Sequence, residues 1–291
     1  MANKSWMGGT FGEAATKTVC KVLTKVVGQT SKAFHQVVLV NLIVGLVQVV
    51  CSLIVLKKKR LSIFGTRSQV LGACAFGVSA CIYGFLAFTV FLCGGEITLN
   101  TFIITLTIVP CAVLDRVIFR DKKLGIRKCC ALAIFFLAGY FILGLPSFAE
   151  VVKFPLWIWL SLISMLLLAI NEVISRSIKD IEPMVKNFWG GLATFVGSLL
   201  VLIFLGKADT LFDFHSELVK KLWILGVIGG LFIVVMWICK VRGYSSGATM
   251  AAKRLLMDSS YLTMVAVIGV WQFGESMTRW KVVGVLTYFG A

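Results

Sequence analysis

The chain has 291 residues, of which 59% are hydrophobic and only 14% charged, and its formal net charge at pH 7 is +16. Its mean hydropathy of +0.95 lies far outside the range of soluble globular domains, so the expected solvent is a lipid bilayer. The basic residues lie in loops between apolar runs rather than on one solvated face, which argues against a nucleic-acid partner. The nine cysteines form no CxxC pair, and thiols in apolar runs usually act as small hydrophobes. Neither a disulfide framework nor a metal site is predicted.

Eight apolar runs of about 20 residues predict helices that cross the membrane, because a helix rises about 1.5 Å per residue and the hydrocarbon core is about 30 Å thick. Charged residues or Gly and Pro separate these runs. A further run at the C-terminal end begins as a span and stops early. The eight predicted spans and this last run are 34–56, 68–93, 97–119, 127–146, 154–176, 183–205, 222–242, 247–271 and 279–291.

The first segment, residues 4–27, is polar for a membrane span. Glu13, Lys17, Lys21 and Lys25 recur every four residues, which places them along one face of a helix. An ionisable group near the middle of the bilayer costs at least about 2.5 kcal/mol, so a spanning helix has to turn this face toward a polar cavity or a partner. The alternative is an amphipathic helix that lies at the membrane surface. The internal repeat favours the cavity.

The two halves of the chain resemble each other weakly. RDKKLGIRKCCALAIFFLAG ends the first half and FGESMTRWKVVGVLTYFG ends the second, with Asp121 opposite Glu275. A shift of about 150 residues also aligns the spans of the two halves, and it pairs the polar first segment with an apolar span. Five spans per half is an odd number, so the halves must enter the membrane in opposite senses. We expect an all-α membrane protein of ten transmembrane helices, arranged as a five-plus-five inverted repeat with halves 1–148 and 149–291.

The loops differ in their content of Lys and Arg. The basic residues concentrate in the loops 57–67, 120–128, 176–186 and 240–246, and fewer lie in the loops between them. Basic loops stay on the cytoplasmic side of a membrane. We therefore expect both termini in the cytoplasm. The membrane we expect for this multi-pass protein is a bacterial cytoplasmic (inner) membrane.

Several ionisable residues lie inside the predicted spans. Lys253, Arg254 and Asp258 are too deep in their span for all of them to reach the interface. Arg254 and Asp258 are four residues apart and can pair on one helix, whereas Lys253 has no such partner and is predicted to face the substrate. Asn171 and Glu172 lie near a span end, where anchoring at the interface explains them, with a cavity role as the alternative.

Other polar and aromatic residues have simpler explanations. Asn41, Gln48 and Asn100 are predicted to form hydrogen bonds between helices rather than to contact a substrate. Trp189 and Tyr83 lie far enough inside their spans to stack on a flat substrate, but ordinary packing is the better explanation. Neither group is therefore counted among the candidate site residues.

Short stretches of the chain resemble the drug/metabolite transporter superfamily, in particular its EamA-type members. They are ESMTRWKVVG from Glu275, DKKLGIR from Asp121, Pro110, GATMAAKRLL from Gly247 and MLLLAINEVISRSI over 165–178. The resemblance implies ten helices in two five-helix halves. It also implies that the Lys253-Arg254 pair is similar to the anion-binding pair of sugar-phosphate translocators. The segment 165–178 is similar to carriers that include S-adenosylmethionine exchangers.

An inverted repeat with charges inside the membrane predicts a secondary transporter that moves a small polar metabolite by alternating access. No Walker A sequence is present, so we expect exchange with a counter-substrate or coupling to an ion, without a cofactor. A membrane-embedded enzyme is one alternative, but HExxH and GxSxG are absent and the only histidines are His35 and His215. A non-transporting receptor or assembly subunit is another. We do not expect an enzyme.

Eight side chains are the candidates for substrate contact: Lys253, Arg254, Asp258, Lys17, Lys21, Glu13, Asn171 and Glu172. Their excess of basic charge favours an anionic or zwitterionic solute, such as a phosphorylated metabolite, a nucleotide derivative or an amino acid. The resemblance to S-adenosylmethionine carriers favours a zwitterionic cation that bears a carboxylate. The sequence leaves these substrates, and the oligomeric state, open.

Overall fold

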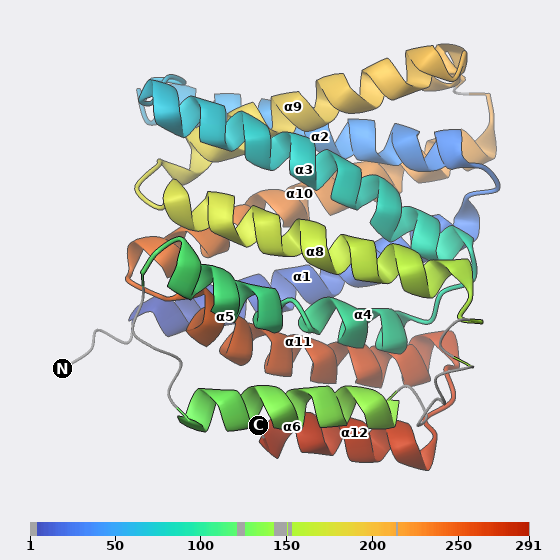
Figure 1. Cartoon of the computed structure of the whole chain (residues 1–291). Coiled ribbons are helices and arrows are strands. Elements are labelled where there is room, and N and C mark those ends of the chain that lie inside the picture. The colour runs from blue at the N-terminus through green and yellow to red at the C-terminus, as the bar shows by residue number, and fades with distance from the viewer. Residues whose placement is uncertain (1–4, 121–125, 143–149, 151–152, 214, 291) are drawn as a thin grey trace.

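The computed structural model describes residues 5–120, 126–142, 150, 153–213 and 215–290, and this part of the chain consists of helices joined by loops and contains no strand (Figure 1). The helices are α1 (Ser5–Thr30), α2 (Phe34–Lys58), α3 (Arg67–Leu92), α4 (Ile97–Thr105), α5 (Ile108–Val117), α6 (Ile126–Ile142), α8 (Leu156–Ser177), α9 (Pro183–Phe204), the 3-10 turn η1 (Ala208–Phe212), α10 (Glu217–Ser245), α11 (Met250–Phe273) and α12 (Arg279–Gly290). An all-α fold was predicted and is confirmed for these residues.

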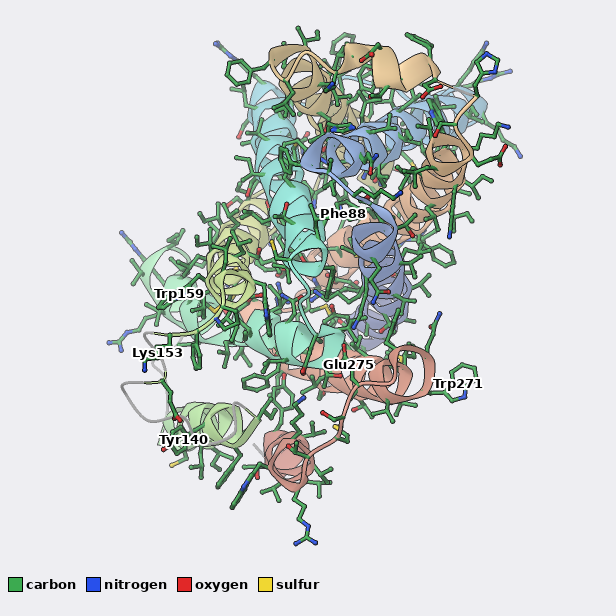
Figure 2. The ribbon with its side chains drawn as sticks, turned by 90° about the vertical axis from the view of Figure 1, so that its right-hand side faces the viewer. Phe88, Tyr140, Lys153, Trp159, Trp271 and Glu275 are labelled. Carbon is green, nitrogen blue, oxygen red and sulfur yellow. The ribbon has the colours of Figure 1, made fainter. Side chains whose placement is uncertain are left out.

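Seven membrane-length segments of the described chain are apolar enough to cross a bilayer. They are α2, α3, the continuous stretch of α4 and α5, α8, α9, α10 and α11. They establish a multi-pass membrane protein. Large apolar side chains on the outer surface are consistent with contact with lipid. Trp271 and Trp159, for example, project away from the bundle with 85% and 44% of their surface exposed (Figure 2).

Each predicted span corresponds to a helix, but the span predicted at 97–119 is broken into α4 and α5. Pro110 lies in the first turn of α5 and has no N–H to offer the carbonyl of Leu106, which instead accepts from the N–H of Val109 at 3.0 Å. The hydroxyl of Thr107, at the break, donates to the carbonyl of Ile104 at 2.5 Å. The break therefore leaves few backbone groups unpaired.

The helices form one bundle in which segments from the two halves of the chain alternate. α2 packs on α9 and α10, α3 on α8 and α9, and α1 on α10 and α11. α11 also contacts α4 and α5. α6 and α12 pair with each other at one edge of the bundle (Figure 1).

The closest approach of α2 and α9 depends on glycine. A Cβ at Gly45 would meet the backbone nitrogen of Phe195 at 2.6 Å and the carbonyl oxygen of Gly191 at 2.9 Å. Small residues allow membrane helices to approach closely.

The ends of α11 are defined by a capping residue and a glycine, and the second of these positions Glu275. Thr249 caps the start of α11 by accepting from the N–H of Ala252. Gly274 ends the helix in the left-handed conformation, with φ of 64°, which side chains other than glycine rarely adopt. The chain turns there, and Glu275 consequently reaches the start of α4.

Candidate functional site

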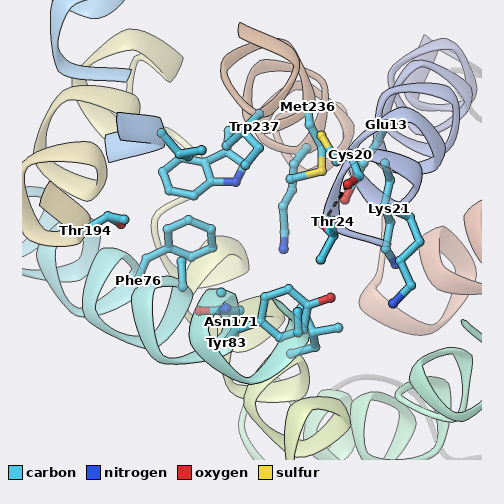
Figure 3. Close-up of a pocket in the computed structure, with 18 of the residues that line it drawn as sticks. Glu13, Cys20, Lys21, Thr24, Phe76, Tyr83, Asn171, Thr194, Met236 and Trp237 are labelled. Carbon is cyan, nitrogen blue, oxygen red and sulfur yellow. Dashed lines mark hydrogen bonds between the residues drawn. The ribbon is translucent and has the colours of Figure 1, made fainter. Parts of the chain in front are cut away.

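A cavity of about 130 Å³ lies among α1, α2, α3, α8, α9, α10 and α11. A stripe of α1 forms one wall, with Glu13, Cys20, Lys21 and Thr24 among its side chains (Figure 3). The wall across from it is aromatic. Its side chains include Phe76 and Tyr83 of α3 and Trp237 of α10 (Figure 3).

Glu172 of α8 is the centre of a buried charge cluster beside this cavity. Its carboxylate lies 2.7 Å from Nζ of Lys240 and 3.0 Å from Nη2 of Arg254, and it accepts a hydrogen bond from the hydroxyl of Tyr244. The residue is 1% exposed. An isolated carboxylate would be costly at this depth, and two helices, α10 and α11, supply the groups that offset it.

The same cluster extends to α1 through α11. Nζ of Lys253 lies 2.5 Å from Oε2 of Glu13 and 3.8 Å from Oε2 of Glu172. Nη1 of Arg254 lies 3.1 Å from Oδ1 of Asp258, and Nζ of Lys17 lies 3.5 Å from the same oxygen. The ion pairs thus connect three carboxylates with four cationic side chains.

Two more buried cations have no carboxylate partner among the described residues. Lys21 donates to Oδ1 of Asn100, whose amide nitrogen donates in turn to Ser161. Lys186 of α9 is 0% exposed, donates to the hydroxyl of Ser175 at 3.0 Å and lies 3.8 Å above the ring of Phe76. The interior around the cavity therefore holds more basic than acidic side chains.

The structure corrects the roles predicted for the two neighbouring cations of α11. Arg254, not Lys253, lines the cavity. Adjacent residues on a helix diverge by about 100°, and Lys253 points instead to Glu13 and Tyr244. The predicted pairing of Arg254 with Asp258 is confirmed.

The polar stripe of α1 faces the interior. Glu13, Lys17 and Lys21 line the cavity, and Lys21 and Lys25 are only 4% and 5% exposed. A helix at the membrane surface would keep its lysines in water, so the surface alternative does not describe α1.

Interfacial anchoring was the wrong explanation for Asn171 and Glu172. Both residues line the cavity and are buried. The burial of Glu172 is tolerated because three cationic side chains and a tyrosine hydroxyl converge on its carboxylate. Oδ1 of Asn171 has no hydrogen-bond partner within the described part of the chain. All eight candidate residues belong to the cluster or to the cavity wall.

Sequence reasoning missed several residues of this site and assigned others to structure. Lys186 and Lys240 were counted as loop residues because each lies near the end of an apolar run. Phe76 and Trp237 gave no signal within their apolar runs. Gln48 was assigned to interhelical hydrogen bonding, yet it lines the cavity. Of the two inner aromatic residues considered, Tyr83 also lines it, whereas Trp189 donates to the carbonyl of Ile63.

Further charge contacts lie away from the cavity, and two of them join helix ends. Lys25 pairs with Glu275, whose oxygens accept from the N–H groups of Ile97 and Thr98 at the start of α4. Burial raises the pKa of Glu275, but hydrogen bonds from Lys25 and from Thr98 outweigh this effect and hold the pKa below its ordinary value. Asp121, predicted to be the counterpart of Glu275, lies outside the described residues.

The second contact joins Arg176 near the end of α8 to Asp115 near the end of α5. Oδ2 of Asp115 accepts from the N–H of Ala251 in the first turn of α11 at 2.9 Å. Each contact thus consists of a cation near the C-terminal end of one helix and a carboxylate that receives the first N–H groups of another.

The described residues contain no group of three or more His, Cys, Asp or Glu side chains that would hold a metal ion.

One solved structure, described only as "Crystal structure of protein", shares this fold. Its TM-score is 0.68 at 15% sequence identity, and the alignment covers 99% of this chain and 95% of that one. No protein-family profile and no curated protein sequence matches the chain. The similarity therefore establishes the fold alone.

Proposed function

We propose that this protein is a secondary transporter that moves a small polar metabolite across a membrane, by alternating access between two five-helix halves. The observation that carries the proposal is the buried charge cluster around Glu172, which borders a cavity between membrane-length helices. Ionisable groups at this depth are expensive and mark substrate or ion pathways. The resemblance to the drug/metabolite transporter superfamily favours the same function.

The proposal includes the ten-helix inverted repeat, in which α1, α2, α3, α4–α5 and α6 correspond to α8, α9, α10, α11 and α12. Corresponding helices begin about 150 residues apart. Their packing supports the correspondence, because α2 packs on α9, α6 on α12 and α4–α5 on α11, while the contact of α1 with α10 repeats that of α3 with α8.

Individual contacts support the correspondence as well. Lys21 and Glu172 are each the seventeenth residue of their helix, and Asn100 and Lys253 are each the fourth. Lys21 contacts Asn100, and Glu172 contacts Lys253. The same pair of positions is thus in contact in both halves, with different side chains.

The two outer contacts provide a route to alternating access. The pair of Lys25 with Glu275 and the pair of Arg176 with Asp115 join equivalent helices, and an inverted repeat places them at opposite ends of the bundle. Opening one contact while the other stays closed would expose the cavity to one side at a time. Placement in a bacterial inner membrane with both termini in the cytoplasm is part of the proposal.

Saturable transport tests the proposal. Purified protein in proteoliposomes is screened for metabolites that raise its melting temperature, since a ligand at 100 times its dissociation constant stabilises by about 2.7 kcal/mol. Each stabilising metabolite is then measured for uptake and counterflow. Transport that saturates is expected, and binding without any flux would instead support a receptor or assembly subunit. Conversion of the ligand to a product would support the membrane-enzyme alternative.

A further inference from the structure

Gln48 of α2 has a side-chain amide without a partner in the wall of the cavity. The residue is 1% exposed, and neither Nε2 nor Oε1 has a hydrogen-bond partner among the described residues. A buried polar atom without a partner is costly, so an amide that keeps both atoms unpaired is suited to receive a ligand. It presents one donor and one acceptor side by side in a plane, the pattern that glutamine uses to bind the edge of a heterocycle such as adenine.

The surroundings of this amide suit a flat ring. Phe76, Tyr83, Phe88, Trp237 and Tyr261 all line the cavity. The rings of Phe76 and Trp237 pack edge to face, with centroids 4.5 Å apart at an angle of 83°. Aromatic side chains bind heterocycles by stacking. The cavity volume of about 130 Å³ is close to the roughly 150 Å³ of an engineered cavity that holds one benzene, so there is room for a single ring.

The charges at the cavity suit an anion. Lys17, Lys21, Lys240 and Arg254 line it, and Glu13 and Glu172 are the carboxylates that do so. Lys186, which lies outside the cavity lining, is a further basic side chain without a carboxylate partner within the described chain. A solute with negative charge would offset this excess, whereas a sulfonium cation would add to it.

We infer that the solute is an anion built on a flat heterocycle, an inference that rests on the transport function proposed above. The amide of Gln48 pairs with the edge of the ring, the aromatic wall of α3 and α10 stacks on its face, and a phosphate or carboxylate lies among the cations of α1 and α11. Figure 3 shows Phe76, Tyr83 and Trp237 across the cavity from Lys21, the two surfaces that the ends of such a solute would contact. Single-ring nucleotides and heterocyclic carboxylates belong to this class, and S-adenosylmethionine does not.

The experiment measures binding of matched probes by the rise in melting temperature of the purified protein. UMP and orotate carry both a ring and an anionic group, uridine carries only the ring, and ribose 5-phosphate carries only the phosphate. We expect UMP or orotate to bind at least tenfold more tightly than uridine, ribose 5-phosphate and S-adenosylmethionine.

Gln48→Leu removes the amide and keeps the size of the side chain. It should weaken binding of the ring-bearing anion at least tenfold and leave the weak binding of ribose 5-phosphate unchanged. Because the substitution also removes two unpaired buried atoms, the variant should unfold at the same temperature as the parent protein or above it. The control is Gln272→Leu, the same change at an exposed glutamine of α11, which should alter none of these constants.

Two results would overturn the inference that the solute contains a heterocycle. One is equal binding of ribose 5-phosphate and UMP, and the other is undiminished binding of the ring-bearing anion by the folded Gln48→Leu variant. Tighter binding of S-adenosylmethionine than of every anion would overturn the anionic class, and so would a stable protein that binds no ring-bearing anion. None of these results would contradict transport itself. The transport function is tested separately, by measuring whether any metabolite that binds also shows saturable counterflow.

Discussion

Lys25 of α1 pairs with Glu275, which lies in the loop after α11 and receives the first two N–H groups of α4. A single carboxylate therefore holds together three segments from both halves of the chain. Arg176 occupies the same position in α8 as Lys25 does in α1, the twenty-first residue of the helix. Its partner Asp115 receives an N–H from the start of α11, which is the counterpart of α4 in the proposed repeat.

Glu275→Gln removes the charge partner of Lys25 and keeps a carbonyl oxygen for the helix N–H groups. We expect this end of the bundle to open more often, since a hydrogen bond to a charged group contributes about 1.5 kcal/mol or more, and about 1.5 kcal/mol corresponds to about tenfold in population. The measurement is maleimide labelling of Cys20, which lines the cavity, kept as the only cysteine. Labelling from the Glu275 side of oriented proteoliposomes should rise about tenfold.

Glu96→Gln is the matched control for this variant. Glu96 pairs with Lys281 at 2.6 Å near the same helices, but its side chain is 40% exposed. Exposed ion pairs contribute little, so labelling of Cys20 should stay at the parent rate. A similar rise in both variants would mean that any charge loss in this region loosens the bundle.

Asp115→Asn is expected to produce the opposite sidedness. Loss of the Arg176 pair should open the other end, so Cys20 becomes more accessible from the side opposite to that of the Glu275 variant. The two variants are compared in the same oriented proteoliposomes. Increased labelling from one shared side would contradict the inverted repeat, since the two contacts would then lie at the same end.

The pH dependence of the Glu275 contact follows from its lowered pKa. A carboxylate whose pKa is lower in the folded state stabilises the protein above its unfolded pKa of about 4.3, and this stabilisation is lost as the pH falls through the folded value. The difference in melting temperature between the parent protein and Glu275→Gln should therefore be constant from about pH 8 to pH 5 and shrink at lower pH. A difference that disappears already near pH 6 would show that the pKa is raised.

Much of the fold was predictable because runs of about 20 apolar residues leave few alternatives to a membrane-length helix. The orientation of single side chains was not. Hydropathy finds the end of an apolar run, not the end of a helix, so Lys240 was assigned to a loop although α10 continues to Ser245. Which of Lys253 and Arg254 faces the cavity depends on how α11 packs against α1 and α8, whose charged partners Glu13 and Glu172 are distant in sequence.

Glu172→Gln should destabilise the protein more than loss of the Lys25–Glu275 pair or of the Arg176–Asp115 pair does. The substitution leaves Lys240 and Arg254 buried beside a neutral amide, and removing one partner of a buried ion pair costs about 3–5 kcal/mol. The double variant Glu172→Gln with Lys240→Met should recover part of this loss, because it removes one uncompensated charge. Both are measured as thermal unfolding in the same detergent, and a double variant less stable than the single one would rule out this coupling.

Arg254 and Lys253 should differ when each is changed to Gln. Arg254 lines the cavity, so its loss removes a positive charge that the solute can contact and should weaken the apparent affinity for an anionic solute about tenfold or more. Lys253 is directed at Glu13 instead, so its loss leaves a buried carboxylate unpaired and should lower the melting temperature with a smaller change in affinity. Asp258→Asn should cause neither the loss of affinity of the Arg254 variant nor the loss of stability of the Lys253 variant, because Arg254 keeps its contact with Glu172. Counterflow in proteoliposomes matched for protein content gives the affinity, and thermal unfolding gives the stability. If the Lys253 variant loses affinity while the Arg254 variant keeps it, Lys253 is the contact for the solute and the cavity must change shape when the solute binds.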